Sequence, residues 1–174
     1  MGAFVAAIFL LLLAIPARAD LADYLARPEP AAGWKKLDED RDGDVAHVQL
    51  ELVSQEWRGE PWRHELDLFR PDDAAHSGVA LLFVTTGRGW FADLDRERRL
   101  AAASGATVAV LGDVPNQPLF GRTEDDLIAY TFEQFLRSGD AEWPLLLPMT
   151  KSAVRAMDAI QELARAEWGR PIDR

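Results

Sequence analysis

Apolar and polar residues alternate along two stretches of the chain, and this period of two predicts two half-buried β-strands. The stretches are residues 48–52 (VQLEL) and residues 62–68 (WRHELDL). Successive side chains of a strand point to opposite faces of a sheet, so an alternating stretch buries one face and leaves the other in water. Glycine and proline lie between the stretches, within residues 54–61, and we therefore expect an antiparallel hairpin with a longish loop.

Two later runs are apolar almost throughout, which is typical of strands buried on both faces of a parallel sheet. These runs are Val79–Val84 and Ala106–Leu111. Between them, Ala92–Ser104 has acidic residues first and arginines later, and Gly105 follows it. This order is typical of a helix and its stop. The sequence thus predicts a β-α-β unit with a right-handed crossover, and an α/β fold.

Three further helical segments are predicted from apolar spacing and from start and stop signals. A short amphipathic turn begins at Asp20, a helix capped by Thr123 runs to about Arg137, and a helix capped by Thr150 ends before Gly169. The side chains expected to face inward are Leu127, Ile128, Phe132, Phe135 and Leu136 in the second segment, and Val154, Met157, Ile160 and Leu163 in the third.

The N-terminal segment has the pattern of an export signal. Ala3–Ile15 is an apolar run of 13 residues, and Pro16 and the sequence Ala17-Arg18-Ala19 follow it. The run is shorter than the roughly 20 residues of a membrane span, and A-x-A is a cleavage pattern. We predict a signal peptide at 1–19, a mature domain at 20–174 and a periplasmic or secreted location, with no stable membrane insertion after cleavage. The alternatives are an N-terminal membrane anchor and a buried helix.

Composition narrows the classes of partner and cofactor. The 174 residues include 29 acidic and 19 basic side chains, giving a formal charge of −10. Nucleic-acid binding needs a basic face, so we expect no nucleic-acid partner. The absence of cysteine in the sequence excludes disulfides and thiolate metal sites. We therefore expect no cofactor.

An acidic segment matches half of a calcium-binding loop. Asp38, Asp40 and Asp42 precede Gly43 in the pattern D-x-D-x-D-G, but Gln49 stands where a bidentate glutamate is needed. We expect a solvated acidic turn, Asp38–Asp44, that leads into the first strand. A weak calcium site at the three aspartates is the alternative, and no other metal site is expected.

Nucleophilic catalysis has no recognisable signal in this sequence. G-x-S-x-G is absent, and no serine falls between a predicted parallel strand and the following helix. The three histidines are interpreted as surface or packing residues. We therefore expect no catalytic residue in this chain.

The loops that follow the two apolar runs are the candidate binding region, because ligands of open α/β sheets bind at the carboxyl ends of strands. Gly87 and Arg88 lie in the first loop and are candidates for an oxyanion hole. The alternative is a plain connection between a strand and a helix. Asn116 and Gln117 lie in the second loop, where they could line the crevice or satisfy turn backbone.

Four stretches together resemble the PhoPQ-activated pathogenicity-related proteins, a family of exported bacterial proteins with an α/β-hydrolase-like fold. They are DYLARPEPAAGW (residues 23–34), LELVSQEWRGEPWRHELDLFRPD (50–72), GDVPNQPLF (112–120) and the segment 124–162 from EDDLIAY to AIQE. The resemblance runs from about Asp20 to Arg174. It implies the N-terminal part of such a fold: an antiparallel hairpin plus parallel strands, with flanking helices and an incomplete sheet.

The resemblance also implies that the nucleophile elbow and its partners lie beyond Arg174, so that the chain is a fragment without activity of its own. Its strand at 79–84 would then be unpaired and would support self-association. The alternative is a small secreted binding domain that stacks a carbohydrate on some of its six tryptophans or binds calcium. The tryptophans are otherwise interpreted as core or loop anchors. An unknown small molecule or peptide is the expected ligand.

Overall fold

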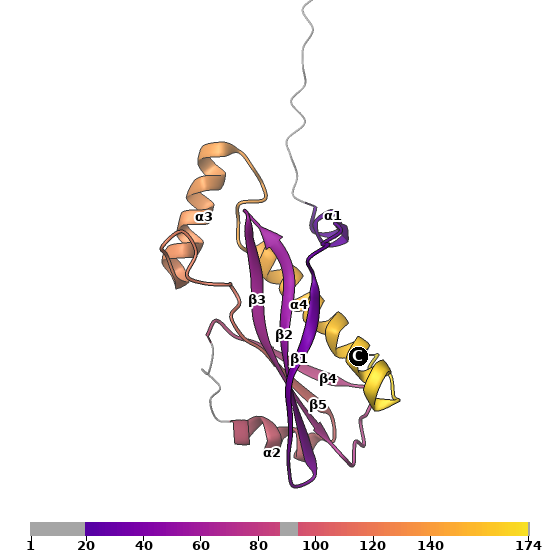
Figure 1. Cartoon of the computed structure of the whole chain (residues 1–174). Helices are drawn as coiled ribbons and strands as arrows, with labels where there is room; N and C mark the ends of the chain where they lie inside the picture. The colour runs from indigo at the N-terminus through magenta and orange to yellow at the C-terminus, as the bar shows by residue number, and fades with distance from the viewer. Residues whose placement is uncertain (1–19, 88–93, 174) are drawn as a thin grey trace, which may run out of the picture.

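The computed structural model describes residues 20–87 and 94–173, and it confirms an α/β fold with an open sheet (Figure 1). The strands are β1 (Gly33–Asp42), β2 (Val45–Trp57), β3 (Glu60–Pro71), β4 (Ala80–Val84) and β5 (Thr107–Leu111). The helices are α1 (Leu21–Ala26), α2 (Leu94–Ser104), α3 (Glu124–Ser138) and α4 (Leu146–Leu163), and a π-helical turn, Ala164–Trp168, extends α4.

The five strands form one sheet in the order β1-β2-β3-β5-β4. β4 and β5 are parallel and are connected through α2, as the sequence predicts, while the other neighbours are antiparallel. The predicted hairpin is therefore the middle of the sheet, because β1 lies outside β2 and β5 pairs with β3. Both strands of the hairpin therefore lie inside the sheet, and neither is an edge strand.

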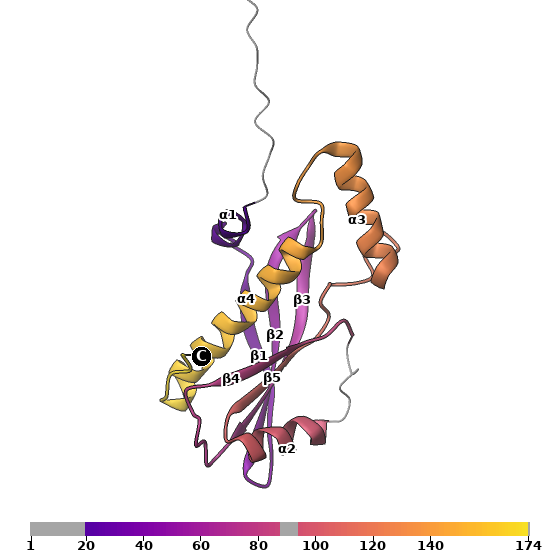
Figure 2. The same ribbon diagram turned by 180° about the vertical axis from the view of Figure 1, so that it is seen from behind.

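Helices cover both faces of the sheet, and β5 shows how one strand meets both (Figure 2). Ala109 and Leu111 belong to the apolar cluster that contains α4, whereas Val108 and Val110 belong to the cluster that contains α2. β5 is therefore buried along its whole length. Among the strands of the described sheet β4 has β5 as its neighbour, and its Leu81 and Val84 are 41% and 47% exposed. The prediction of burial on both faces is right for β5 and wrong for β4.

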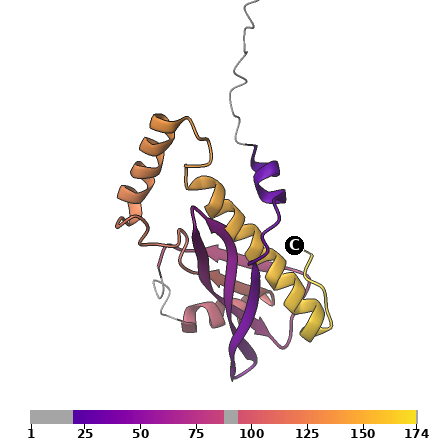
Figure 3. The same ribbon diagram turned by 45° about the horizontal axis from the view of Figure 1, so that its top comes forward.

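A third apolar cluster lies at the hairpin end of the sheet and joins α1, α3 and α4. It contains the buried side chains of Tyr24, Trp57, Trp62, Leu119, Leu127 and Leu145. Figure 3 shows α3 outside the sheet, so only one side of this helix packs on the cluster. Phe132 and Leu136 are 41% and 80% exposed. The expectation that both face inward is wrong, and the same holds for Met157 of α4.

Several boundaries differ from the sequence-based expectation because pairing between strands extends further than side-chain alternation. The predicted loop at 54–61 is mostly strand, and the turn consists of Arg58 and Gly59, both with positive φ. The predicted acidic turn is mostly β1, which pairs with β2 along residues 33–42. The turn itself follows at Gly43, with a φ of 57°.

Two helix starts also differ from expectation. α4 begins at Leu146, so Thr150 lies inside the helix and its hydroxyl donates to the carbonyl of Leu146. Thr123 does precede α3, but its side chain makes no capping hydrogen bond. The side-chain oxygen of Gln117 accepts from the backbone N–H of Glu124 instead. A side chain seven residues before Glu124 thus replaces the cap expected from Thr123.

Candidate functional site

The loops that follow β4 and β5 lie side by side at the carboxyl edge of the parallel strands. The backbone N–H of Thr85 donates to the carbonyl of Leu111 at 2.9 Å, and that of Val114 donates to the carbonyl of Thr85 at 3.0 Å. A Cβ added to Gly112 would lie 3.8 Å from the carbonyl oxygen of Gly87. The structure therefore brings together the two loops that the sequence proposed for ligand contact.

The side-chain amides of Asn116 and Gln117 both form hydrogen bonds within the protein. The Asn116 side-chain oxygen accepts from the backbone N–H of Arg63 at 3.1 Å. Gln117 donates to the carbonyl of Thr86 at 3.3 Å and to the Glu124 carboxylate at 2.5 Å. These contacts favour the second interpretation: Asn116 satisfies a backbone N–H of β3, and Gln117 connects the loop after β5 to the loop after β4.

Gly87 is half-buried, and a Cβ placed on it would meet nothing within 4 Å among residues 20–87 and 94–173. The space beside this residue is open, which an anion approaching the backbone would need. Arg88, the other oxyanion-hole candidate, lies outside the described residues. The oxyanion role of both residues stays a prediction.

A serine and a histidine do meet in this fold, but inside it. The His64 Nδ1 lies 3.0 Å from the carbonyl oxygen of Asp113 and 3.2 Å from that of Gly112, so it must carry the proton. Its Nε2 therefore accepts from the Ser54 hydroxyl at 2.9 Å. Burial lowers the pKa of His64, which keeps the ring neutral.

This pair has the hydrogen bond of a nucleophile and its base, yet Ser54 is fully buried and His64 is 1% exposed. The Ser54 hydroxyl also lies 3.0 Å from the hydroxyl of Ser152 in α4. We therefore assign a structural role: the network connects β2, β3, the loop after β5 and α4. The sequence indicated a surface or packing role for His64 but did not indicate these partners.

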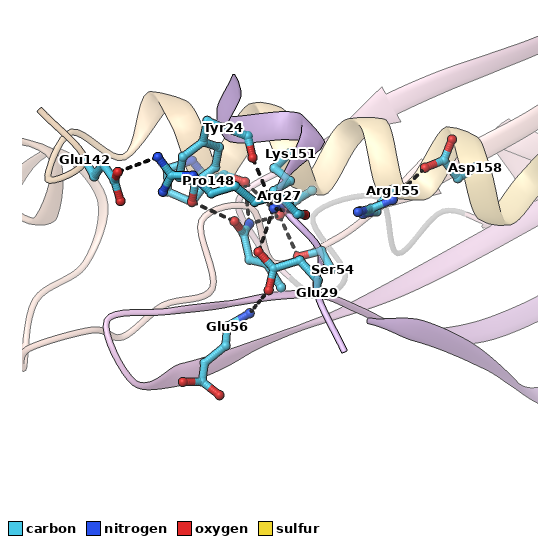
Figure 4. A network of polar contacts seen from close by, with 12 residues as sticks. Tyr24, Arg27, Glu29, Ser54, Glu56, Glu142, Pro148, Lys151, Arg155 and Asp158 are labelled. Carbon is cyan, nitrogen blue, oxygen red and sulfur yellow. Dashed lines mark hydrogen bonds and ion pairs between the residues drawn. The ribbon is translucent and has the colours of Figure 1, made fainter. Parts of the chain in front are cut away.

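A second buried network surrounds Lys151 of α4 (Figure 4). Its ammonium donates to the Glu29 carboxylate at 2.6 Å and to the carbonyls of Tyr24 and Arg27, both at 3.3 Å. The Tyr24 hydroxyl donates in turn to the Gln55 side chain at 2.9 Å. Lys151 thereby holds the segment around α1 against α4. A sequence signal existed, because a lysine three residues after Pro148 falls on the buried stripe of this helix.

The acidic residues of β1 are engaged by cations within the protein. Asp40 accepts from Arg98 of α2 at 2.7 Å and lies 3.1 Å from the Nδ1 of His47. Asp42 lies 3.5 Å from Arg98, and the Asp38 carboxylate accepts from the backbone N–H of Glu39. Within residues 20–87 and 94–173, no His, Asp and Glu side chains form a group that could hold a metal ion.

His47 occupies a buried position between two carboxylates. Its Nε2 lies 2.7 Å from Asp67, its Nδ1 faces Asp40, and its ring stacks on Phe69 at 4.7 Å. Burial lowers the pKa of His47, but the hydrogen bonds to Asp67 and Asp40 outweigh burial and raise it overall. The protonated ring can donate to both carboxylates at once.

The tryptophans serve mainly as anchors. Trp57 and Trp62 are buried and pack edge to face, and Trp143 packs on Trp57 in the same way. The Arg58 guanidinium covers the ring of Trp143 at 4.3 Å. These contacts support the anchoring interpretation for Trp57, Trp62 and Trp143, whereas Trp90 lies outside the described residues.

The comparisons with known proteins agree with this fold. The family model of the PhoPQ-activated pathogenicity-related proteins matches residues 21–173, and the chain belongs to this family. The autocrine proliferation repressor protein A of Dictyostelium discoideum is 31% identical over 162 residues, which are 83% of this chain and 33% of that protein. The chain thus spans about a third of the length of this curated relative.

Solved structures with a similar arrangement are esterases of the α/β-hydrolase type. A candidate acetyl xylan esterase from Bacteroides fragilis superimposes with a TM-score of 0.51, at 11% identity, over 82% of this chain and 40% of that one. Acetyl xylan esterase 1 from Thermoanaerobacterium gives 0.49 at 18% identity, over 91% and 49%. Together with the family, the superposition on the Bacteroides fragilis structure gives an α/β-hydrolase-like fold. In the part of the chain that the structure describes, no helix has the length and apolarity of a membrane span.

Proposed function

We propose that this protein is an exported member of its family in which residues 20–174 build the scaffold of a hydrolase-like domain. In this proposal the loops after β4 and β5 flank the site of acyl transfer in a full-length relative. The nucleophile, acid and base belong to segments outside these residues, so this chain alone does not turn over esters.

The observation that carries the proposal is the position of the serine and histidine side chains in the described structure. Within residues 20–87 and 94–173, Ser54 and His64 are the serine–histidine pair at hydrogen-bond distance, and both are closed off from solvent. β4 and β5 continue into Thr85 and Gly112, so neither ends in a serine. Acyl transfer needs an accessible nucleophile together with its base and an oxyanion hole.

An active-site-directed fluorophosphonate and a small chromogenic ester test this directly on the purified protein. We expect labelling no greater than that of the matched Ser54→Ala variant, and no turnover above that of the variant. Stoichiometric labelling of one serine, with turnover that is lost when this serine is replaced, would overturn the proposal.

Export is supported by the apolar run Ala3–Ile15 and the Ala17-Arg18-Ala19 pattern that follows it. Intact-mass spectrometry of the product from the periplasm or medium of an exporting bacterium is expected to find Asp20 as the first residue. A product that retains Met1–Leu11 would contradict cleavage at this point.

A further inference from the structure

A cavity of about 240 Å³ opens at the N-terminal ends of the parallel strands β4 and β5. The loops that follow these strands lie at their other end. The cavity lies where β3 ends, β5 begins and the segment that follows α4 returns to the sheet. There the backbone N–H of Asp173 donates to the carbonyl of Gly78 at 3.0 Å. Its lining includes Arg70, Asp72, Ser77, Thr107, Trp168 and Arg170.

Two arginines give this cavity a positive charge in a chain whose formal charge is −10. The Asp72 carboxylate lies 2.5 Å from Arg41, and this hydrogen bond holds the pKa of Asp72 below its usual range. This acid is thus paired with Arg41, outside the cavity, and it also interacts with the charge of Arg70. Arg170 has no ion pair or hydrogen bond among residues 20–87 and 94–173, so its guanidinium is free to bind a ligand.

The Arg70 side chain is oriented by a neighbouring ring, and one of its N–H donors lacks a hydrogen-bond partner among the described residues. Its guanidinium carbon lies 5.2 Å from the centre of the Trp168 ring, which orients the side chain by a cation–π contact. Its Nε is buried and has no hydrogen-bond partner among the described residues.

The chemistry of the lining selects an oxyanion. Guanidinium groups bind carboxylate and phosphate oxygens through paired N–H donors, and the hydroxyls of Ser77 and Thr107 can donate to the same oxygens. The volume is several times the roughly 30 Å³ that one water occupies in the liquid, and it lies below the usual range for drug-sized ligands. The ligand is therefore a small organic molecule that carries the anion.

We propose that this cavity is a binding site for the phosphate or carboxylate group of a small organic molecule, held by Arg70 and Arg170. The site is separate from the proposed hydrolase scaffold loops. Its test does not depend on any activity of the protein.

Isothermal titration with inorganic phosphate, phenyl phosphate and benzoate distinguishes the two anionic groups. We expect saturable binding of at least one probe, and phenyl phosphate or benzoate is expected to bind more tightly than inorganic phosphate because the cavity holds more than the anion. Arg170→Gln is expected to weaken binding about tenfold, equivalent to about 1.4 kcal/mol. Arg170 is exposed, so this variant should fold as the wild type does.

Arg165→Gln is the matched control, because it removes the same charge from an exposed arginine whose guanidinium donates to Gln161 and does not line the cavity. The indole N–H signal of Trp168, assigned with Trp168→Phe, is expected to shift with the same probe and the same affinity. The proposal is overturned if no probe binds at millimolar concentration, or if Arg170→Gln and Arg165→Gln weaken binding equally.

Discussion

Charged and titratable side chains inside this fold are stable only because other groups replace the water that they lose, and Lys151 is the clearest case. It is 1% exposed, and its three partners lie between residues 24 and 29. Removing one partner of a buried ion pair leaves the other charge without compensation.

We expect Lys151→Met to lower the free energy of unfolding by about 3 kcal/mol, because the half-buried Glu29 would lose its cation. Urea unfolding followed by far-UV circular dichroism measures this. Arg155→Met is the control: its pair with Asp158 is partly exposed, and its loss should cost no more than about 1 kcal/mol. Equal losses in the two variants would mean that the Lys151–Glu29 pair contributes no more to the free energy of unfolding than the exposed Arg155–Asp158 pair does.

The two buried histidines should give the stability opposite dependences on pH. The pKa of His47 is raised in the folded state, so its contribution is present below the unfolded pKa of about 6.5 and is lost as the pH rises through the folded pKa. The pKa of His64 is lowered, so its contribution is present above that value and is lost as the pH falls through the folded pKa.

Unfolding free energies of the wild type, His47→Gln and His64→Gln across about pH 5 to 8 test both signs. The difference between wild type and His47→Gln should fall as the pH rises, and the difference between wild type and His64→Gln should rise. Slopes of the same sign would show that one of the two protonation states is assigned wrongly.

The local sequence pattern could not predict that His64 and Lys151 take part in buried hydrogen-bond networks, because their partners lie far away along the chain. His64 bonds to a carbonyl 48 residues away, and Lys151 bonds to a carboxylate 122 residues away. For the predicted site, the chain order sufficed to place the loops after β4 and β5 together. It did not show that the Gln117 amide would donate to the Thr86 carbonyl and to the Glu124 carboxylate.

At the scale of elements, periodicity predicted where strands and helices lie but not how far they extend or what covers them. The β-α-β unit and the central hairpin were predictable because their apolar patterns depend on burial. β1 was missed because an edge strand can be formed by charged residues: its acids face water or Arg98, and its pairing comes from the backbone.

The junction between α2 and β5 depends on one glycine. Gly105 has a φ of 63°, and a Cβ there would lie 3.1 Å from both the Cβ and the backbone nitrogen of Ala75. Gly139 ends α3 with a φ of 72° but has open space around it. The two positions share a backbone conformation and differ in crowding.

We expect Gly139→Ala to cost about 1 kcal/mol, which is the price of a left-handed conformation for alanine. Gly105→Ala should cost at least about 1 kcal/mol more, because the backbone at Ala75 must also move. Thermal and urea unfolding of both variants gives the difference. Equal losses would show that the contact at Ala75 relaxes without cost.

At the scale of the whole molecule, the two edges of the sheet differ in how they meet water. β1 presents lysines and acids, which discourage pairing with another chain, whereas β4 consists of Ala80, Leu81, Leu82, Phe83 and Val84 without a charge. Within residues 20–87 and 94–173, β5 is the strand that pairs with β4, so β4 is an edge strand of the described sheet. The formal charge of −10 opposes association between copies, but none of that charge lies on β4.

We therefore expect the purified protein to self-associate with rising concentration through β4, and Leu81→Lys to shift it toward the monomer. Leu81 is 41% exposed, so a lysine at this position can keep its charge in water while it blocks pairing along the edge. Met157→Lys is the matched control, because it adds the same charge at a 46% exposed apolar position of α4, away from the edge. Sedimentation velocity and light scattering over a range of concentrations measure the outcome. If the wild type remains monomeric, or if both lysine variants reduce association equally, β4 is not the surface through which copies of this chain meet.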